Sequence, residues 1–157
     1  MDRVAGNTII RFTETDPVLL EVDAVVEEQD TNFLMGNPPV IKVTVESFSS
    51  LVKKMEVQTP ATPGTMTVKQ SIPKRFIVVV YDIEHKPITS PVWIEQALKN
   101  ILINCEKHKI TTLAMPLLGT AYGKFKDEEI IDLLQSSLIE NRHQFPRKIL
   151  IYKIQAG

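Results

Sequence analysis

The sequence predicts an α/β fold, in which helices pack on a mixed or parallel β-sheet. Two runs rich in aliphatic and β-branched residues, 75–83 and 111–118, have the pattern of strands buried on both faces. Apolar residues recur with helical spacing in the segment that follows each run. Strands that alternate with helices in this way are typical of a sheet covered by helices.

The composition indicates an ordinary globular domain. The chain has 157 residues, of which 43% are hydrophobic and 24% are charged, so we expect one domain over residues 1–157. A formal net charge of −1 gives no basic field, so we expect no nucleic-acid binding. One cysteine, Cys105, excludes an internal disulfide, and no run approaches signal-peptide or membrane-spanning length. We therefore expect a soluble intracellular, cytoplasmic protein without a membrane partner.

The first half of the chain predicts short elements. Residues 7–12 and 21–26 are predicted strands separated by a turn-like segment. Residues 46–55 carry apolar side chains at i, i+3, i+4 and i+7, which predicts a short amphipathic helix. After a loop rich in proline and glycine, the alternation of Met66 and Val68 predicts another short strand.

The second half predicts the longer elements. Ser90 is a candidate N-cap, Pro91 would occupy the first helical position, and the apolar face of this helix would include Cys105 as a core thiol. A second helix is predicted to begin at Asp127, within an acidic first turn. Residues 148–154 predict a final strand.

The stretch MPLLGTAYG, residues 115–123, is the candidate for chemistry. Small residues follow a buried strand and precede a helix, where backbone amides and the helix N-terminus together favour a phosphate. Tyr122 would present its ring or hydroxyl group to a sugar or base. The alternative is a tight turn in which glycine only gives clearance to neighbouring chain.

Two blocks of the sequence resemble the macrodomain family. LLGTAYG resembles the family pattern A-L-G-T-G-x-x-G-x-P, although Ala121 replaces the second glycine. DPVLLEVDAVV, residues 16–26, resembles D-I-T-x-L-x-V-D-A-I-V. The resemblance covers most of the chain and is weak over residues 42–70.

The resemblance implies a three-layer α/β/α sandwich with a mixed central sheet and a cleft for ADP-ribose. Asp16 would accept a hydrogen bond from the adenine amino group, unless it is only a turn residue before Pro17. The amides of residues 119–123 would hold the pyrophosphate, and Asp30 would bind a ribose hydroxyl. No cofactor and no metal are implied. The candidate ligand-binding residues are Asp16, Asp30, Gly36, Leu118, Gly119, Thr120, Ala121, Tyr122 and Gly123.

Residues 27–39 depart from the family pattern. Glu27 and Asp30 stand where macrodomains have asparagines, and their carboxylates would repel a pyrophosphate if they faced the cleft. Pro38 and Pro39 interrupt the expected glycine-rich loop and lack backbone N–H donors. The consecutive acids, Glu28 included, are interpreted as a solvated loop edge rather than an acid–base pair.

Three functions remain open. The first is a binding module for ADP-ribose or a related nucleotide. The second is an interaction or regulatory domain that binds a protein partner and no ADP-ribose. An ADP-ribosyl hydrolase ranks last because the asparagines are missing, and we assign no catalytic residue. An open cleft beside Asp16 favours the first, whereas a cleft filled by side chains such as Phe33, Met35 or Tyr122 favours the second.

The histidines and the cysteine give no sign of a metal centre. The histidines His85, His108 and His143 lie far apart in polar surroundings, and none has metal-ligand spacing with another or with Cys105.

Overall fold

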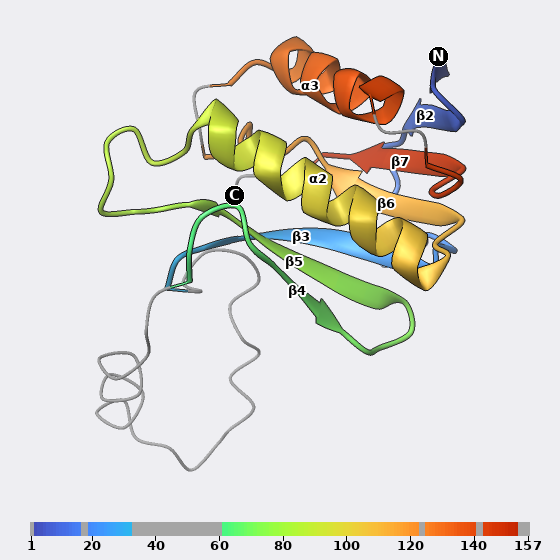
Figure 1. Cartoon of the computed structure of the whole chain (residues 1–157), viewed down its shortest axis with the longest axis horizontal. Coiled ribbons are helices and arrows are strands. Elements are labelled where there is room, and N and C mark those ends of the chain that lie inside the picture. The colour runs from blue at the N-terminus through green and yellow to red at the C-terminus, as the bar shows by residue number, and fades with distance from the viewer. Residues whose placement is uncertain (1, 17–18, 33–60, 123–124, 141–142, 154–157) are drawn as a thin grey trace.

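A mixed sheet organises the computed structural model, which describes residues 2–16, 19–32, 61–122, 125–140 and 143–153 (Figure 1). Seven described strands follow the order β1-β2-β7-β6-β3-β5-β4. The strands are β1 (Arg3–Ala5), β2 (Thr8–Phe12), β3 (Ala24–Asp30), β4 (Met66–Lys69), β5 (Lys74–Tyr81), β6 (Thr112–Pro116) and β7 (Lys148–Tyr152).

The centre of the sheet is parallel and its edges are antiparallel. β2, β7, β6, β3 and β5 run in one direction, whereas β1 pairs antiparallel with β2 and β4 pairs antiparallel with β5. Residues 76–81 of β5 are all buried, as a nearly continuous apolar run requires. The carboxyl ends of the parallel strands therefore meet at one edge of the sheet.

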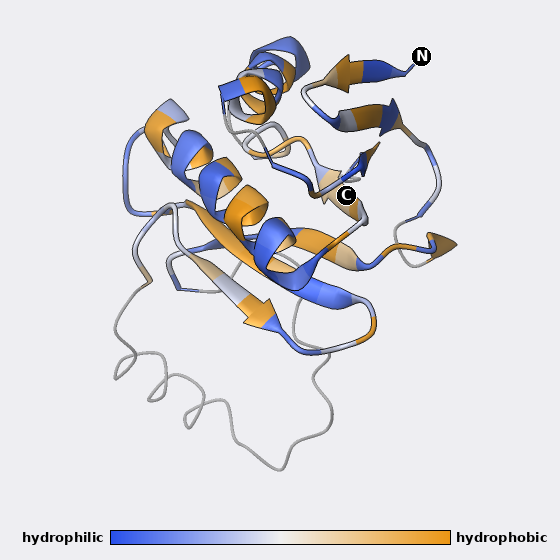
Figure 2. Ribbon diagram, turned by 45° about the vertical axis from the view of Figure 1, so that its right-hand side comes forward, coloured by the Kyte–Doolittle hydropathy of each residue, from blue (hydrophilic) through white to orange (hydrophobic). Residues whose placement is uncertain are grey.

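Both described helices lie on the same face of the sheet and contact each other (Figure 1). Helix α2 (Pro91–His108) begins after Ser90, whose hydroxyl accepts a hydrogen bond from the Val92 amide at 3.3 Å. It ends at Lys109, which adopts a left-handed conformation. Helix α3 (Asp127–Glu140) begins with three acidic residues, a sequence that suits a helix N-terminus. Figure 2 shows both helices with a hydrophobic and a hydrophilic side.

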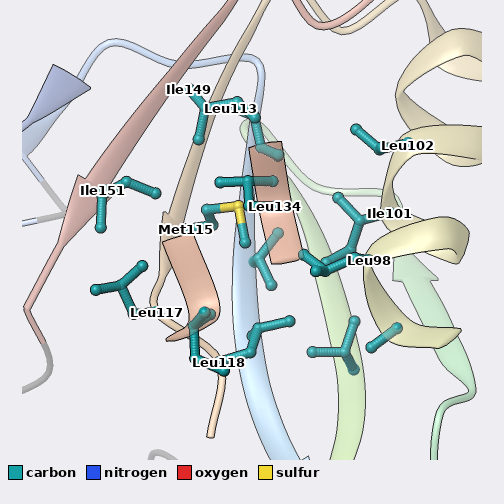
Figure 3. Packing of buried hydrophobic residues seen from close by; sticks show 14 of the residues in the cluster. Leu98, Ile101, Leu102, Leu113, Met115, Leu117, Leu118, Leu134, Ile149 and Ile151 are labelled. Atoms are coloured by element: carbon teal, nitrogen blue, oxygen red, sulfur yellow. The ribbon is translucent and has the colours of Figure 1, made fainter. Parts of the chain in front are cut away.

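The main core fills the space between these helices and the sheet. Figure 3 shows Leu98 and Ile101 of α2 pointing toward Leu134 of α3 and toward Met115 of β6. All four side chains are at most 1% exposed. Burying a side chain of this size stabilises the fold by about 1.5–3 kcal/mol, so the core holds both helices firmly on the sheet. Cys105 is also fully buried in this cluster, as predicted.

A smaller apolar cluster lies on the opposite face of the sheet. It contains Val25, Ala114 and Tyr152, with Leu20 and Val22 packed against them. Successive strand residues point to opposite faces, which is why Val25 belongs to this cluster while Val26 belongs to the main core. The helix predicted over residues 46–55 lies outside the described residues.

The predicted α/β fold with a mixed sheet is confirmed, and two strands differ from the prediction. The three-residue strand β1 was not predicted. The strand expected over residues 21–26 begins at Ala24 and continues to Asp30, so its acidic residues belong to the sheet. Neither described helix has the length and apolar character needed to cross a membrane.

Candidate functional site

The candidate site lies where the parallel strands end. In open α/β sheets, ligands bind beyond the carboxyl ends of the strands, where the connecting loops leave a crevice. At this edge β6 leads through residues 117–122 toward α3, and β7 ends at Tyr152. Asp16 follows β2, which pairs with β7, so Asp16 leaves the sheet at the same edge.

The segment after β6 makes a tight turn around Gly119. The backbone φ angle of Gly119 is +80°, a conformation that residues other than glycine rarely adopt. A Cβ atom on Gly119 would stand 2.8 Å from the Phe125 ring and 3.0 Å from the Ile94 side chain. Thr120 closes the turn, because its hydroxyl donates to the Leu117 carbonyl at 2.7 Å. Clearance therefore explains why residue 119 is glycine.

A cavity of about 290 Å³ opens beside this turn. It lies between the ends of β6 and β7 and the first turn of α3. Among the described residues that line it, Asp127 and Lys153 are charged, so both signs of charge are present. The residues that line it are Pro116, Leu117, Thr120, Ala121, Asp127, Tyr152 and Lys153.

Glu28 reaches the same turn from β3. Its Oε2 atom accepts a hydrogen bond from the Gly119 amide at 3.0 Å. The Glu28 residue is only 5% exposed. Burial raises the pKa of the Glu28 carboxyl, and the hydrogen bond from Gly119 partly offsets this rise. The turn thus already holds a carboxylate on one of its amides.

Two tyrosines form a second connection between the turn and the sheet. The rings of Tyr81, at the end of β5, and Tyr122 meet edge to face, with centroids 5.7 Å apart. Tyr81 is fully buried, and burial together with the nearby Glu28 charge raises its pKa. Tyr122 is 45% exposed. Neither the Tyr81 hydroxyl nor Glu28 Oε1 has a hydrogen-bond partner among the described residues.

The prediction that residues 27–30 form a solvated loop edge is wrong. Glu28 and Asp30 are buried on strand β3, at 5% and 0% exposure. Glu27 points to the other face, where its carboxylate accepts two hydrogen bonds from the Arg75 guanidinium at 2.9 and 2.6 Å. Pairing with β5 continues through Asp30, and these contacts let acidic residues extend the strand.

The other predicted site residues occupy different environments. Thr120 and Ala121 line the cavity, whereas the Leu118 side chain is fully buried in the core, so only its backbone could meet a ligand. Asp16 is exposed and is not among the cavity-lining residues. Gly36, Gly123 and the alternative cleft fillers Phe33 and Met35 lie outside the described residues, as do Pro38 and Pro39.

Five cavity-lining residues were not predicted as site residues. Two of them, Pro116 and Leu117, belong to the stretch 115–123 that was singled out, and the others are Asp127, Tyr152 and Lys153. Asp127 was expected only as the start of a helix, and Tyr152 only as part of the last strand. Lys153 was expected inside the last strand, predicted over residues 148–154, whereas β7 ends at Tyr152 and Lys153 follows it directly. A polar residue near the end of a predicted parallel strand was the signal that could have identified it. Among the described residues, no group of three His, Cys, Asp or Glu side chains could hold a metal ion.

No family model and no curated protein matches the sequence. Many solved structures match the fold, among them three macrodomains. The macrodomain of Thermus aquaticus DarG has 19% identity and a TM-score of 0.61, covering 92% of this chain and 98% of its own. A variant of the Oceanobacillus iheyensis macrodomain with ADPR has 11% identity and a TM-score of 0.67, covering 98% and 88%.

The third is the macro domain of ganglioside induced differentiation associated protein 2, with 11% identity and a TM-score of 0.63. The match covers 93% of this chain and 77% of that one. These likenesses establish that the fold is macrodomain-like.

Proposed function

We propose, on the premise that this chain has a macrodomain-like fold, that it is a binding module for ADP-ribose or a related phosphate-bearing nucleotide. One of the similar structures, from Oceanobacillus iheyensis, is described with ADPR. The proposal needs a cavity at the carboxyl edge of the sheet, and this chain has one of about 290 Å³.

The composition of that cavity is the observation that carries the proposal. Its lining combines Thr120 and Ala121 of the turn, Asp127 in the first turn of α3, and Lys153 after β7. A helix N-terminus carries partial positive charge, and a nearby ammonium group adds a full one. Asp127 offsets part of this charge, so we expect modest affinity. Tyr152 also lines the cavity, and we expect its ring to pack against a sugar or base.

Asp16 remains the proposed partner of the adenine amino group. The pairing of β2 with β7 supports this role, because it brings Asp16 and Lys153 to the same edge. Adenine would then bind toward β2, and the phosphates would bind toward the turn at residues 119–122.

Calorimetric titration with ADP-ribose, AMP and ADP tests the proposal. We expect saturable binding of ADP-ribose, and we expect Lys153→Ala to weaken it roughly fivefold, the effect of losing one partly exposed charge contact. Asp16→Ala should also weaken binding. Lys148→Ala is the matched control, since Lys148 begins the same strand at its opposite end and should leave the affinity unchanged.

Absence of binding to all three nucleotides at high micromolar protein would contradict the proposal. The second candidate, an interaction domain without nucleotide binding, would then be preferred. The hydrogen bond from Gly119 to Glu28 favours that candidate, because it occupies a donor that a phosphate would use.

We propose binding without hydrolysis. The resemblance assigns hydrolysis to asparagines at positions that hold Glu27 and Asp30 here, and Glu27 is engaged in an ion pair with Arg75. Incubation with an ADP-ribosylated protein should therefore release no ADP-ribose. Release at a rate that scales with enzyme concentration would contradict this part of the proposal.

A further inference from the structure

The Glu28 carboxylate occupies the position of an anion at the proposed phosphate-binding turn. Its Oε2 atom lies 3.0 Å from the Gly119 nitrogen, the distance of a good N–H···O bond. A backbone amide has a single hydrogen, so a phosphate oxygen and Glu28 compete for it. The turn is thus partly saturated by the protein itself.

When Glu28 is ionised, no cation among the described residues pairs with its carboxylate. Glu28 is 5% exposed, so water screens it weakly. The Gly119 amide, which is neutral, is the hydrogen-bond donor to Glu28 among the described residues. Its Oε1 atom has no hydrogen-bond partner among the described residues. By contrast, Glu27, one residue earlier, is paired with Arg75 on the other face.

The turn is also held in place at its other end. Tyr81 lies close enough for the Glu28 charge to influence it, and its ring packs against the ring of Tyr122. The φ angle and the close packing of Gly119 limit rotation of the peptide group that carries its amide. A ligand that uses the Gly119 amide must therefore break the hydrogen bond from this amide to Glu28.

We propose that Glu28 sets the ligand charge that this cleft accepts, by keeping phosphate from the Gly119 amide and by opposing dianionic terminal phosphates more than singly charged phosphodiesters. This inference rests on the proposed function, since it concerns selection at the same site. ADP-ribose contains only phosphodiester-type phosphates, whereas ADP ends in a phosphate that carries close to two charges at neutral pH. The cleft should therefore prefer ADP-ribose to ADP.

The experiment compares wild type, Glu28→Gln and Glu27→Gln by calorimetric titration with ADP-ribose, ADP and adenosine at pH 7.5. Glu28→Gln keeps a side-chain oxygen for the Gly119 amide and removes the charge. We expect its affinity for ADP-ribose to rise about tenfold, with a larger gain for ADP. Adenosine, which has no phosphate, should bind wild type and variant alike. Glu27→Gln, the matched control, should behave as wild type.

The possible outcomes separate this inference from the proposed function. Wild type that binds ADP-ribose, together with Glu28→Gln that gains nothing for either phosphate ligand, overturns the inference alone. Binding by Glu28→Gln but not by wild type overturns the proposed function and supports the inference. Absence of binding by both proteins overturns both.

An NMR measurement on wild type guards against a folding defect in the variant. The Gly119 amide cross-peak of ¹⁵N-labelled protein should move less on addition of ADP-ribose than those of Thr120 and Ala121, which line the cavity. A Gly119 cross-peak that moves most would show that ADP-ribose displaces Glu28, and would overturn the inference.

Discussion

Single residues determine the shape of the candidate site, and Gly119 is the clearest case. It combines a φ angle of +80° with close contact to two side chains that would each collide with a Cβ atom. The other small residue of the turn, Ala121, lies on the cavity side and has no such constraint. Substitutions at these two positions therefore test whether glycine is needed in this turn to avoid a steric clash or to let a ligand approach the backbone.

Gly119→Ala should lower the free energy of unfolding by about 1–3 kcal/mol, the cost of holding a residue other than glycine in this conformation. Collision with Phe125 and Ile94 adds to that cost. Chemical denaturation measures the change. Ala121→Gly is the control and should cost less, because it needs no new space. Equal stability of Gly119→Ala and wild type would show that the turn adapts freely.

Glu28→Gln should make stability less dependent on pH. Burial raises the pKa of Glu28 above its ordinary value of 4.5, so the folded state binds the proton more tightly than the unfolded state. The contribution of Glu28 to the free energy of unfolding is therefore fully present below pH 4.5, and it is lost as the pH rises through the raised pKa of the folded state. At pH 7 the variant should therefore unfold at a higher denaturant concentration than wild type.

The difference should vanish at low pH, where Glu28 is protonated in both states. Burial raises the pKa values of Tyr81 and Tyr152, with smaller contributions from the charge of Glu28 at Tyr81 and from those of Glu27 and Glu28 at Tyr152, so both tyrosines remain neutral throughout this range. Glu27→Gln is the control: it removes an ion pair and should not be more stable than wild type at pH 7. A Glu28→Gln variant less stable than wild type at pH 7 would contradict the prediction.

Among the elements, helix α2 has the N-cap that the sequence predicted, Ser90. Ser90→Ala removes the side-chain acceptor of the Val92 amide, and should lower the free energy of unfolding by about 0.5–1 kcal/mol. We expect the lower part of the usual range because the bond is 3.3 Å long. Ser136→Ala, at an exposed position within α3, should be neutral or slightly stabilising. A loss at Ser136 as large as at Ser90 would contradict capping.

Elements with dense apolar patterns were predictable, and those held by tertiary contacts were not. The apolar periodicity of α2 and α3 and the continuous run of β5 predicted elements close to those observed. The end of β3 looked like a loop because its last four residues are polar. The ion pair of Glu27 with Arg75 and the hydrogen bond of Glu28 to Gly119 join positions far apart in the sequence, so local pattern could not reveal them.

The same limit applies to the candidate site. Glycine and threonine in the turn at residues 119–122 were visible as a motif, and two of those residues, Thr120 and Ala121, line the cavity. Lys153 could not be recognised as a site residue, because its position beside the turn depends on the pairing of β7 with β6. Asp16 and its proposed adenine contact remain a prediction.

At the scale of the whole molecule, the net charge of the protein does not attract an anionic nucleotide. A net charge of −1 creates no attractive field around the protein. Under the proposed function, recognition would therefore depend on groups at the cavity itself, chiefly Lys153 and the first turn of α3. Under the same proposals, one charged side chain beside the cavity is enough to decide between ligands.

The place of β7 in the sheet also bears on how the protein is made. β7 comes last in sequence among the described strands, yet it lies between β2, near the N-terminus, and β6. During synthesis on the ribosome, the hairpin of β1 and β2 has no neighbour to join until β7 has emerged. A nascent chain therefore lacks both the bridge across its sheet and one wall of its cavity until translation of this segment is complete.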